Sequence, residues 1–146
     1  MVEAERTSYY VNLLAALILD LLVSLVVKVT VRRPRPSYHH SKDFLVSVKI
    51  DKKFSFPSGH TTRAIMCGCL LLYSLELSFS SQILVLTWSI STAVSRVMLG
   101  RHYVTDVIAG SIFGFLQFYA MVHYLHIDDK TCQSIAKHCQ SLLSRS

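Results

Sequence analysis

Three short groups of polar residues interrupt an otherwise apolar chain, and each group could contact a phosphate. They combine cationic side chains, a glycine within a backbone turn, and an imidazole with a carboxylate nearby. In chain order they are Lys28 with Arg35-Pro36, then Pro57-Ser58-Gly59-His60, then Ser95-Arg96 with His102 and Asp106. Ionisable groups at the edge of a lipid-embedded segment are costly, so their presence there indicates function.

His102 and Asp106 are the candidates for covalent chemistry. Their spacing of four residues places both side chains on one face of a helix. A carboxylate that accepts a hydrogen bond from one ring nitrogen fixes the tautomer and leaves the other nitrogen to attack phosphorus. It would also stabilise the cationic ring that forms on phosphorylation. Taken alone, however, the spacing is better explained by Asp106 as an acid in the first turn of a helix, where the helix dipole favours it.

The Pro57-Ser58-Gly59-His60 run lies directly before an apolar segment, where a helix would begin. The unpaired N–H groups and the positive dipole end of a helix start bind phosphate well. Gly59 would allow close approach, Ser58 would add a hydroxyl donor, and His60 would protonate the departing oxygen. For these four residues alone, an ordinary capping sequence with an incidental histidine is the alternative.

Lys28, Arg35 and Arg96 would supply positive charge. The prolines on both sides of Arg35 prevent a continuous helix, which would direct this arginine back over the end of the preceding segment. A guanidinium offers a planar fork to phosphate oxygens, and an ammonium offers a point charge. For Arg32 and Arg33 we favour contact with lipid headgroups instead.

Four apolar segments must position these groups. Of the 146 residues, 51% are hydrophobic and 16% are charged, and the mean hydropathy is +0.40. A soluble domain would carry about 25% charged residues. The segments cover roughly residues 9–27, 61–79, 83–99 and 104–125, each near the ~20 residues that a membrane-crossing helix needs. Because backbone groups in lipid must pair internally, the sequence predicts an all-α transmembrane helical bundle of about four spanning helices.

Loop lengths would bring the polar groups together. Tight turns at residues 79–82 and 100–103 join the later segments, and a long cationic loop from Lys28 to Pro57 joins the first two. If all four segments span, the end of the first, the start of the second, the end of the third and the start of the fourth share one membrane face. The three polar groups occupy those ends. Asp20, within the first segment, is expected to bond to a neighbouring helix rather than take part in chemistry.

The order and spacing of these positions resembles the three signature motifs of the lipid phosphate phosphatase family, the type 2 phosphatidic acid phosphatases. The resemblance spans at least Lys28 to Asp106. It implies His102 as nucleophile, Asp106 as its orienting partner and His60 as acid and base. It also implies five phosphate-binding residues, namely Lys28, Arg35, Ser58, Gly59 and Arg96. It implies no metal and no cofactor, because cations and a helix dipole would supply the electrostatic stabilisation.

The residues around the motifs are similar to the branch that acts on polyisoprenoid diphosphates, including presqualene diphosphate. They are Val31-Arg32-Arg33, Phe54-Ser55-Phe56, Thr61-Thr62-Arg63-Ala64 and the run from Ser95 to His102. This similarity implies hydrolysis of isoprenoid diphosphates such as farnesyl diphosphate, and of some phosphatidate-type lipids, through a phosphohistidine intermediate.

Residues 1–146 are expected to form a single membrane phosphatase domain, with residues 127–146 as a polar tail that holds a short amphipathic helix at about 135–143. The resemblance implies two further helices before the one that carries Lys28 in typical family members, and this chain is expected to lack them. One alternative is therefore a catalytically impaired membrane scaffold or regulator. Another is a different activity of the same pocket, such as sugar phosphate or vanadate chemistry.

The net charge of +6 lies at the ends of apolar segments, which argues against nucleic acid and favours membrane lipids and a lipid phosphate substrate as partners. A homo-oligomer is left open. Eleven of the fifteen Lys and Arg residues lie between Lys28 and Arg101, on the proposed catalytic face. The positive-inside rule places that face in the cytosol. We expect a multi-pass integral membrane protein of the endoplasmic reticulum or nuclear envelope.

Overall fold

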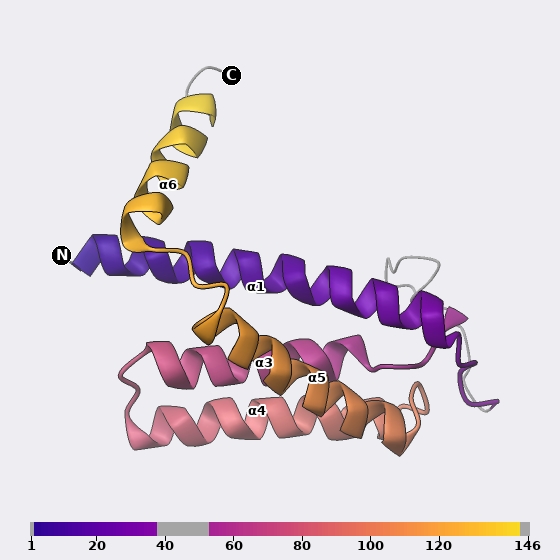
Figure 1. Cartoon of the computed structure of the whole chain (residues 1–146). Coiled ribbons are helices and arrows are strands. Elements are labelled where there is room, and N and C mark those ends of the chain that lie inside the picture. Colours follow the sequence, from indigo (N-terminus) through magenta and orange to yellow (C-terminus); the bar gives the residue numbers. More distant parts are fainter. Residues whose placement is uncertain (1, 38–52, 144–146) are drawn as a thin grey trace.

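Five helices make up most of the described part of the protein, residues 2–37 and 53–143 of a computed structural model. They are α1 (Val2–Val31), α3 (Gly59–Ser74), α4 (Phe79–Met98), α5 (Val104–His123) and α6 (Asp129–Leu143). Residues 38–52 of the predicted cationic loop lie outside the described residues, and so do Lys42, Lys49 and Lys52 of the charge count. The all-α prediction is confirmed, and α1, α3, α4 and α5 lie together in one bundle (Figure 1).

Helix α3 is central, because it packs against α5, α4 and α1. Small residues allow the closest of these approaches. A Cβ atom at Gly110 of α5 would lie 2.9 Å from the Ser58 carbonyl oxygen, and one at Gly114 would overlap the carbonyl oxygen of Thr62. The hydrophobic effect does not drive helices together in lipid, so the van der Waals contacts between closely approaching backbones stabilise the pair instead. The α3–α5 pair is therefore the tightest contact in the bundle.

The inner face of α1 carries polar side chains at intervals of four residues. Asn12, Asp20, Ser24 and Lys28 are all buried, as is Ala16, which occupies the same face. The Asp20 carboxylate accepts a hydrogen bond from Ser24 Oγ at 3.4 Å and pairs with Nη2 of a helix α3 arginine, Arg63, at 2.9 Å. The expected pairing of Asp20 with a neighbouring helix is confirmed. A charge pair thus fastens α1 to α3 within the bundle.

Two helices contain stretches long and apolar enough to cross a membrane, Thr7–Val31 in α1 and Val104–His123 in α5. Helix α4 has 20 residues and α3 has 16. Large apolar side chains are exposed along the outward faces of α1, α4 and α5, among them Leu22, Leu84 and Ile112. These features agree with a helical membrane bundle, while the number of four spanning helices stays a prediction.

Two helix starts differ from the sequence prediction. Residues 79–82, expected as a turn, form the first turn of α4, because Ser78 Oγ accepts a hydrogen bond from the Ser81 N–H at 3.4 Å. Helix α6 begins at Asp129 rather than near 135, because the Asp128 carboxylate accepts bonds from the N–H (3.1 Å) and hydroxyl (2.7 Å) of Thr131. Hydropathy does not register such polar caps.

The polar tail is attached to the bundle through Asn12. The Asn12 side chain donates to the Ile127 carbonyl oxygen at 3.1 Å and accepts from the Ile127 N–H at 2.9 Å. Helix α6 projects away from this attachment near the start of α1 (Figure 1). The tail is therefore held at the end of the bundle where α1 begins.

The close α3–α5 contact gives a test of the fold. Gly114→Ala should lower the free energy of unfolding by a net ~1–2 kcal/mol, because overpacking against the Thr62 backbone exceeds the gain in helix propensity. Gly68→Ala is the matched control, since its added methyl meets a side-chain atom, Ser89 Oγ, which can move at the cost of its bond to the Ala64 carbonyl oxygen, whereas the Thr62 backbone cannot. Reversible unfolding in mixed detergent micelles would measure both variants. Equal stability of Gly114→Ala and the parent protein would contradict the packing.

Candidate active site

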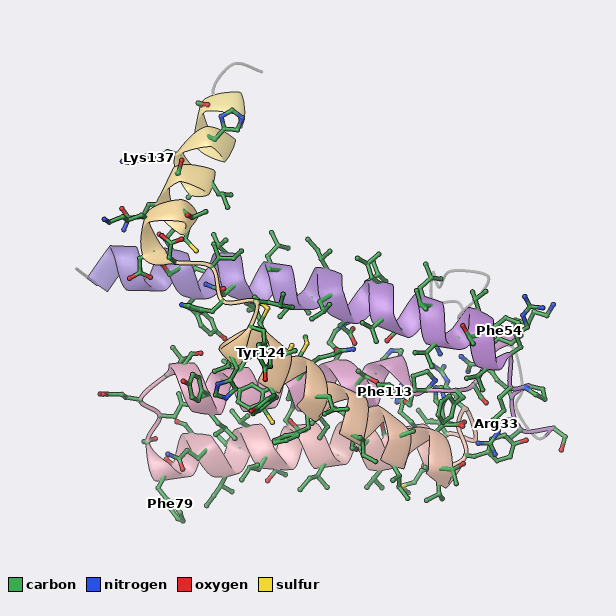
Figure 2. The ribbon with its side chains drawn as sticks, in the orientation of Figure 1. Arg33, Phe54, Phe79, Phe113, Tyr124 and Lys137 are labelled. Atoms are coloured by element: carbon green, nitrogen blue, oxygen red, sulfur yellow. The ribbon has the colours of Figure 1, made fainter. Side chains whose placement is uncertain are left out.

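The ends of four helices that carry the polar groups lie at one end of the bundle. These are the end of α1, the start of α3, the end of α4 and the start of α5 (Figure 1). In Figure 2, Arg33 and Phe54 lie at this end, whereas Phe79 and Tyr124 lie toward the opposite end. Residues that are up to 78 positions apart, Lys28 and Asp106, therefore meet in one region.

His102 lies in the turn before α5 and is 3% exposed. Its Nδ1 is 2.8 Å from the main-chain carbonyl oxygen of Ser55. A carbonyl oxygen can only accept a hydrogen bond, so the proton of the neutral ring is on Nδ1. The lone pair is then on Nε2. This tautomer leaves Nε2 as the nucleophilic nitrogen.

Asp106 is fully buried in the first turn of α5, and its carboxylate contacts other groups more closely than it contacts His102. One oxygen accepts a bond from Arg33 Nη1 at 2.8 Å, and the other accepts the Tyr103 N–H at 2.9 Å. The second oxygen is 3.8 Å from His102 Nδ1, beyond hydrogen-bonding distance. Asp106 thus caps the helix, and the Ser55 carbonyl takes the orienting contact that the sequence suggested for Asp106.

The surroundings of His102 keep its ring neutral. The pKa of His102 is lowered from 6.5 to about 4, first by burial and then by the positive charges of Arg35 and Lys28. The hydrogen bond to Ser55 and the Asp106 carboxylate act in the opposite direction and offset only part of this effect. At neutral pH the imidazole is therefore uncharged and able to act as a nucleophile.

Lys28 is buried at the end of α1, with 4% of its surface exposed. Its ammonium donates a hydrogen bond to the carbonyl oxygen of Pro57 at 2.9 Å. That carbonyl directly precedes Ser58 and the start of α3. Lys28 therefore holds the segment that leads into α3 while it places a positive charge near His102.

Ser58 connects the starts of α3 and α5. Its N–H donates to the Asp106 carbonyl oxygen at 3.1 Å, and its buried hydroxyl oxygen accepts a bond from Thr61 Oγ1 at 2.9 Å. Its own carbonyl oxygen accepts bonds from the N–H and hydroxyl of Thr62. Thr61 and Thr62, which sequence reasoning did not assign to the site, thus fix Ser58. The Ser58 hydroxyl lies inside the protein rather than at its surface.

Gly59 and His60 form the first turn of α3, and His60 is exposed. A Cβ atom added to Gly59 would find no atom closer than Ser24 Oγ at 4.0 Å. The packing of the protein therefore does not require a glycine at this position. The space that a side chain at this position would occupy is open apart from Ser24 Oγ.

Arg35 and Arg96 are half-buried at the same end of the bundle. Arg35 follows the end of α1, and its positive charge lowers the pKa of His102. Arg96 lies in the last turn of α4, where its Nε and Nη2 both donate to Ser95 Oγ at 3.1 Å. Arg35, just after α1, and Arg96, in the last turn of α4, thus both lie at the end of the bundle that carries His102.

Arg33 requires a correction of the sequence interpretation, which favoured contact with lipid headgroups. Besides the bond to Asp106, its Nη1 donates to Thr105 Oγ1 at 2.7 Å, and its guanidinium lies 4.1 Å from the centre of the Tyr103 ring. Three residues at the start of α5, Tyr103, Thr105 and Asp106, therefore hold this side chain. Arg32 is exposed, and its Nε donates a hydrogen bond to the Val29 carbonyl oxygen at 2.8 Å. Sequence alone does not distinguish the two arginines, because the choice depends on the direction of the chain after α1.

A cavity of about 310 Å³ lies at the opposite end of the bundle, with Tyr9, Asn12 and Met121 in its lining, and it shares no residue with the His102 region.

Within residues 2–37 and 53–143, no three His, Cys, Asp or Glu side chains lie close enough together to bind a metal ion.

The chain is similar in sequence to a known protein family. The model of the PAP2 superfamily matches residues 9–129, which include every residue of the three polar groups. The chain belongs to the PAP2 superfamily. The predicted membership in this phosphatase family is confirmed, whereas the polyisoprenoid diphosphate branch stays a prediction.

Curated relatives carry phosphatase names. The chain is 30% identical to "Probable lipid phosphate phosphatase beta" of Arabidopsis thaliana, over 84% of this chain and 68% of the relative. It is 35% identical to "Phosphatidylglycerophosphatase B" of Bacillus subtilis, over 68% of this chain and 50% of the relative. It is 38% identical to "Lipid A 4'-phosphatase" of Porphyromonas gingivalis, over 71% of this chain and 45% of the relative. The alignments thus cover about two thirds of the plant relative and about half of each bacterial one. No solved structure matches the chain significantly.

The state of His102 can be measured directly. In ¹⁵N-histidine NMR spectra of the detergent-solubilised protein, His102 should be neutral at pH 7 with its proton on Nδ1, and should titrate near pH 4. Lys28→Met should raise the pKa of His102 toward 6.5, because it removes a nearby positive charge. Lys53→Met, at an exposed lysine of the same end, should change it less. A ring that is already charged at pH 7, or that carries its proton on Nε2, would refute this description.

Proposed function

We propose that this protein is a membrane phosphatase that hydrolyses lipid phosphates and diphosphates through a phosphohistidine at His102. The observation that carries the proposal is the buried, neutral imidazole whose Nδ1 is occupied by the Ser55 carbonyl beside the cations Lys28 and Arg35. A nucleophile with one defined reactive nitrogen next to positive charge suits attack on an anionic phosphate. Membership in the PAP2 superfamily supports the same chemistry.

The reaction would proceed by two displacements at phosphorus. In the first, the lone pair of His102 Nε2 forms a bond to phosphorus, the bond from phosphorus to the leaving oxygen breaks, and His60 protonates that oxygen. In the second, His60 takes a proton from water, the water oxygen attacks the phosphohistidine, and the N–P bond breaks to return a neutral imidazole. The exposed His60 at the start of α3 is suited to exchanging protons with water.

Transition-state charge would be stabilised by this chain's own groups. Lys28, Arg35 and Arg96 supply cations, and the start of α3 supplies N–H groups with the positive end of the helix dipole. The open space beside Gly59 supports the approach of phosphoryl oxygens to that helix start. Neither a metal ion nor a cofactor takes part in this scheme. Ser58 would contribute through the backbone position that it fixes, since its hydroxyl is buried.

The proposed substrates are polyisoprenoid diphosphates, such as presqualene or farnesyl diphosphate, with phosphatidate-type lipids as further substrates. The apolar outward faces of α1, α4 and α5 would receive the lipid tails, while the charged end of the bundle would receive the phosphate. When the terminal phosphoryl group of a diphosphate is transferred to His102, the leaving group is a phosphate monoester, which needs less protonation than the alkoxide that leaves from an alkyl monophosphate. Lys28 and Arg35, whose charges both act on His102, together with Arg96 at the same end of the bundle, suit the higher charge of a diphosphate.

We further propose a multi-pass protein of the endoplasmic reticulum or nuclear envelope, with the site facing the cytosol. In the described residues, the end of the bundle near His102 carries Lys28, Arg33, Arg35 and Arg96 among its cations. The tail at the opposite end carries Lys130 and Lys137. This asymmetry supports the orientation through the positive-inside rule.

His102→Asn should reduce phosphate release from lipid substrates by roughly a thousandfold or more, because it removes the nucleophile. Arg32→Ala is the matched control, and it should mainly weaken association with membranes or substrate. Purified protein in detergent would be assayed with farnesyl diphosphate, with and without EDTA, and EDTA should have no effect. Inactivity of the unaltered chain would favour the scaffold or regulator alternative. Equal losses in both variants would contradict the assigned roles.

The substrate class has its own test. Because a phosphate monoester is a better leaving group than an alkoxide, kcat/KM for farnesyl diphosphate should exceed that for dipalmitoyl phosphatidate by roughly tenfold, about 1.4 kcal/mol. Both lipids would be presented in the same mixed micelles at equal surface concentration. His102→Asn would supply the background rate for each lipid. Faster hydrolysis of phosphatidate would contradict the diphosphate assignment but not the phosphatase assignment.

A further inference from the structure

Arg33 contacts both groups that face Nδ1 of His102. Through its main chain, the Arg33 carbonyl oxygen accepts the Ser55 N–H at 2.9 Å, and the Ser55 carbonyl in turn accepts the proton of His102. Through its side chain, Arg33 donates to Asp106 at 2.8 Å. One residue thus fixes the present partner of the imidazole and also the carboxylate that lies 3.8 Å from it.

Arg33 and His102 face different oxygens of the Asp106 carboxylate: Arg33 donates to Oδ1, whereas Oδ2, which accepts the Tyr103 N–H at 2.9 Å, faces the ring. In the unphosphorylated protein the ring is neutral, whereas the guanidinium is always charged, so the charge-assisted bond to Arg33 is the stronger interaction. Phosphorylation of Nε2 makes the ring cationic while Nδ1 keeps its proton. The attraction between the ring and Asp106 then increases, and the oxygen that faces the ring is already nearby.

The guanidinium is held firmly enough to maintain its bond to Asp106. Thr105 accepts a second bond from Nη1, and the ring of Tyr103 lies below the guanidinium carbon at 4.1 Å. The Arg33 side chain is 34% exposed, so solvent reaches it but does not surround it. These contacts leave Arg33 in a fixed position relative to the start of α5.

We infer that Arg33 is a positioning residue of the reaction, which holds the Asp106 carboxylate away from His102 and so keeps the phosphohistidine short-lived. This inference rests on the proposed function of His102. A cationic phosphoimidazole releases its phosphoryl group readily, because the imidazole leaves as a neutral ring. A carboxylate that bonded strongly to Nδ1–H would draw off that positive charge and stabilise the intermediate. Arg33 limits this effect in two ways: its charge offsets the negative charge of the carboxylate, and its bond to Oδ1, together with the Tyr103 N–H on Oδ2, fixes the carboxylate 3.8 Å from the ring.

The other charged groups around His102 define the expected direction of change. Lys28 from α1 and Arg35 from the segment after α1 both disfavour a charged ring, and Asp106 from α5 favours it. Loss of Arg33 removes the cation that offsets the Asp106 charge and one of the two bonds that fix its carboxylate, so Asp106 should favour a charged ring more strongly. The His102 ring should then be more easily protonated, and its phosphorylated form should persist longer.

The experiment compares Arg33→Gln, Arg33→Lys and, as the matched control, Arg32→Gln. Arg33→Gln should raise the pKa of His102 toward 6.5 in the ¹⁵N-histidine titration, lower kcat on the order of tenfold with little change in KM, and increase the fraction of phosphoenzyme trapped at steady state. Arg33→Lys keeps the charge but loses the planar fork, so it should lie between the parent and Arg33→Gln. Arg32→Gln should match the parent in the pKa of His102, in kcat and in the trapped fraction at saturating substrate, with any change confined to KM.

An unchanged pKa of His102 in Arg33→Gln would overturn the inference. A rise in KM at constant kcat would overturn it as well, because that result identifies Arg33 as a headgroup contact. Thermal unfolding monitored by circular dichroism would show whether each variant folds, and Arg33→Lys supplies a second variant if Arg33→Gln does not. The titration needs no turnover. If the unaltered chain releases no phosphate, the proposed function fails, while the titration still decides whether Arg33 controls the contact between Asp106 and His102.

Discussion

The hydrogen bond from His102 Nδ1 to the Ser55 carbonyl is the interaction on which the candidate site depends. It fixes the tautomer of the imidazole, and it joins the turn before α5 to the segment before α3. That segment is irregular, so its buried carbonyl groups need partners other than those of a helix. His102 provides one for Ser55, and Lys28 provides one for Pro57. The same bonds that satisfy the backbone therefore bring together the proposed nucleophile, His102, and a cation, Lys28.

The bundle beneath the site explains why these positions are well defined. Helix α3 is held to α5 by glycine contacts and by the bond between the Ser58 N–H and the Asp106 carbonyl. It is held to α1 by the Asp20–Arg63 pair, which lies two turns along α1 from Lys28. In the proposed function, tails of different lipids would contact the outward faces without changing these interior contacts. Such an arrangement would suit a family whose relatives are named for different lipids, as "Phosphatidylglycerophosphatase B" and "Lipid A 4'-phosphatase" are.

The helices and their shared end could be predicted from the sequence, because hydropathy and loop length determine which helix ends meet. The sequence therefore predicted correctly that Lys28 and His102 lie in one region. The partner of His102 could not be predicted, because a main-chain carbonyl such as that of Ser55 leaves no signature in side-chain types. The role of Arg33 was missed for a related reason, since two adjacent arginines differ only in the direction that the chain gives them. The His-x-x-x-Asp spacing correctly indicated proximity, but not which group the carboxylate would bind.

Isolation of the phosphoenzyme tests the central claim most directly. Rapid quenching of the protein during turnover of a ³²P-labelled lipid diphosphate, under alkaline conditions that preserve phosphohistidine, followed by peptide mapping, identifies both the residue and the ring nitrogen. The account predicts phosphate on Nε2 of residue 102, because Nδ1 is occupied by Ser55. Phosphate on Nδ1 of that ring, on His60 alone, or on no histidine during measurable turnover would contradict it.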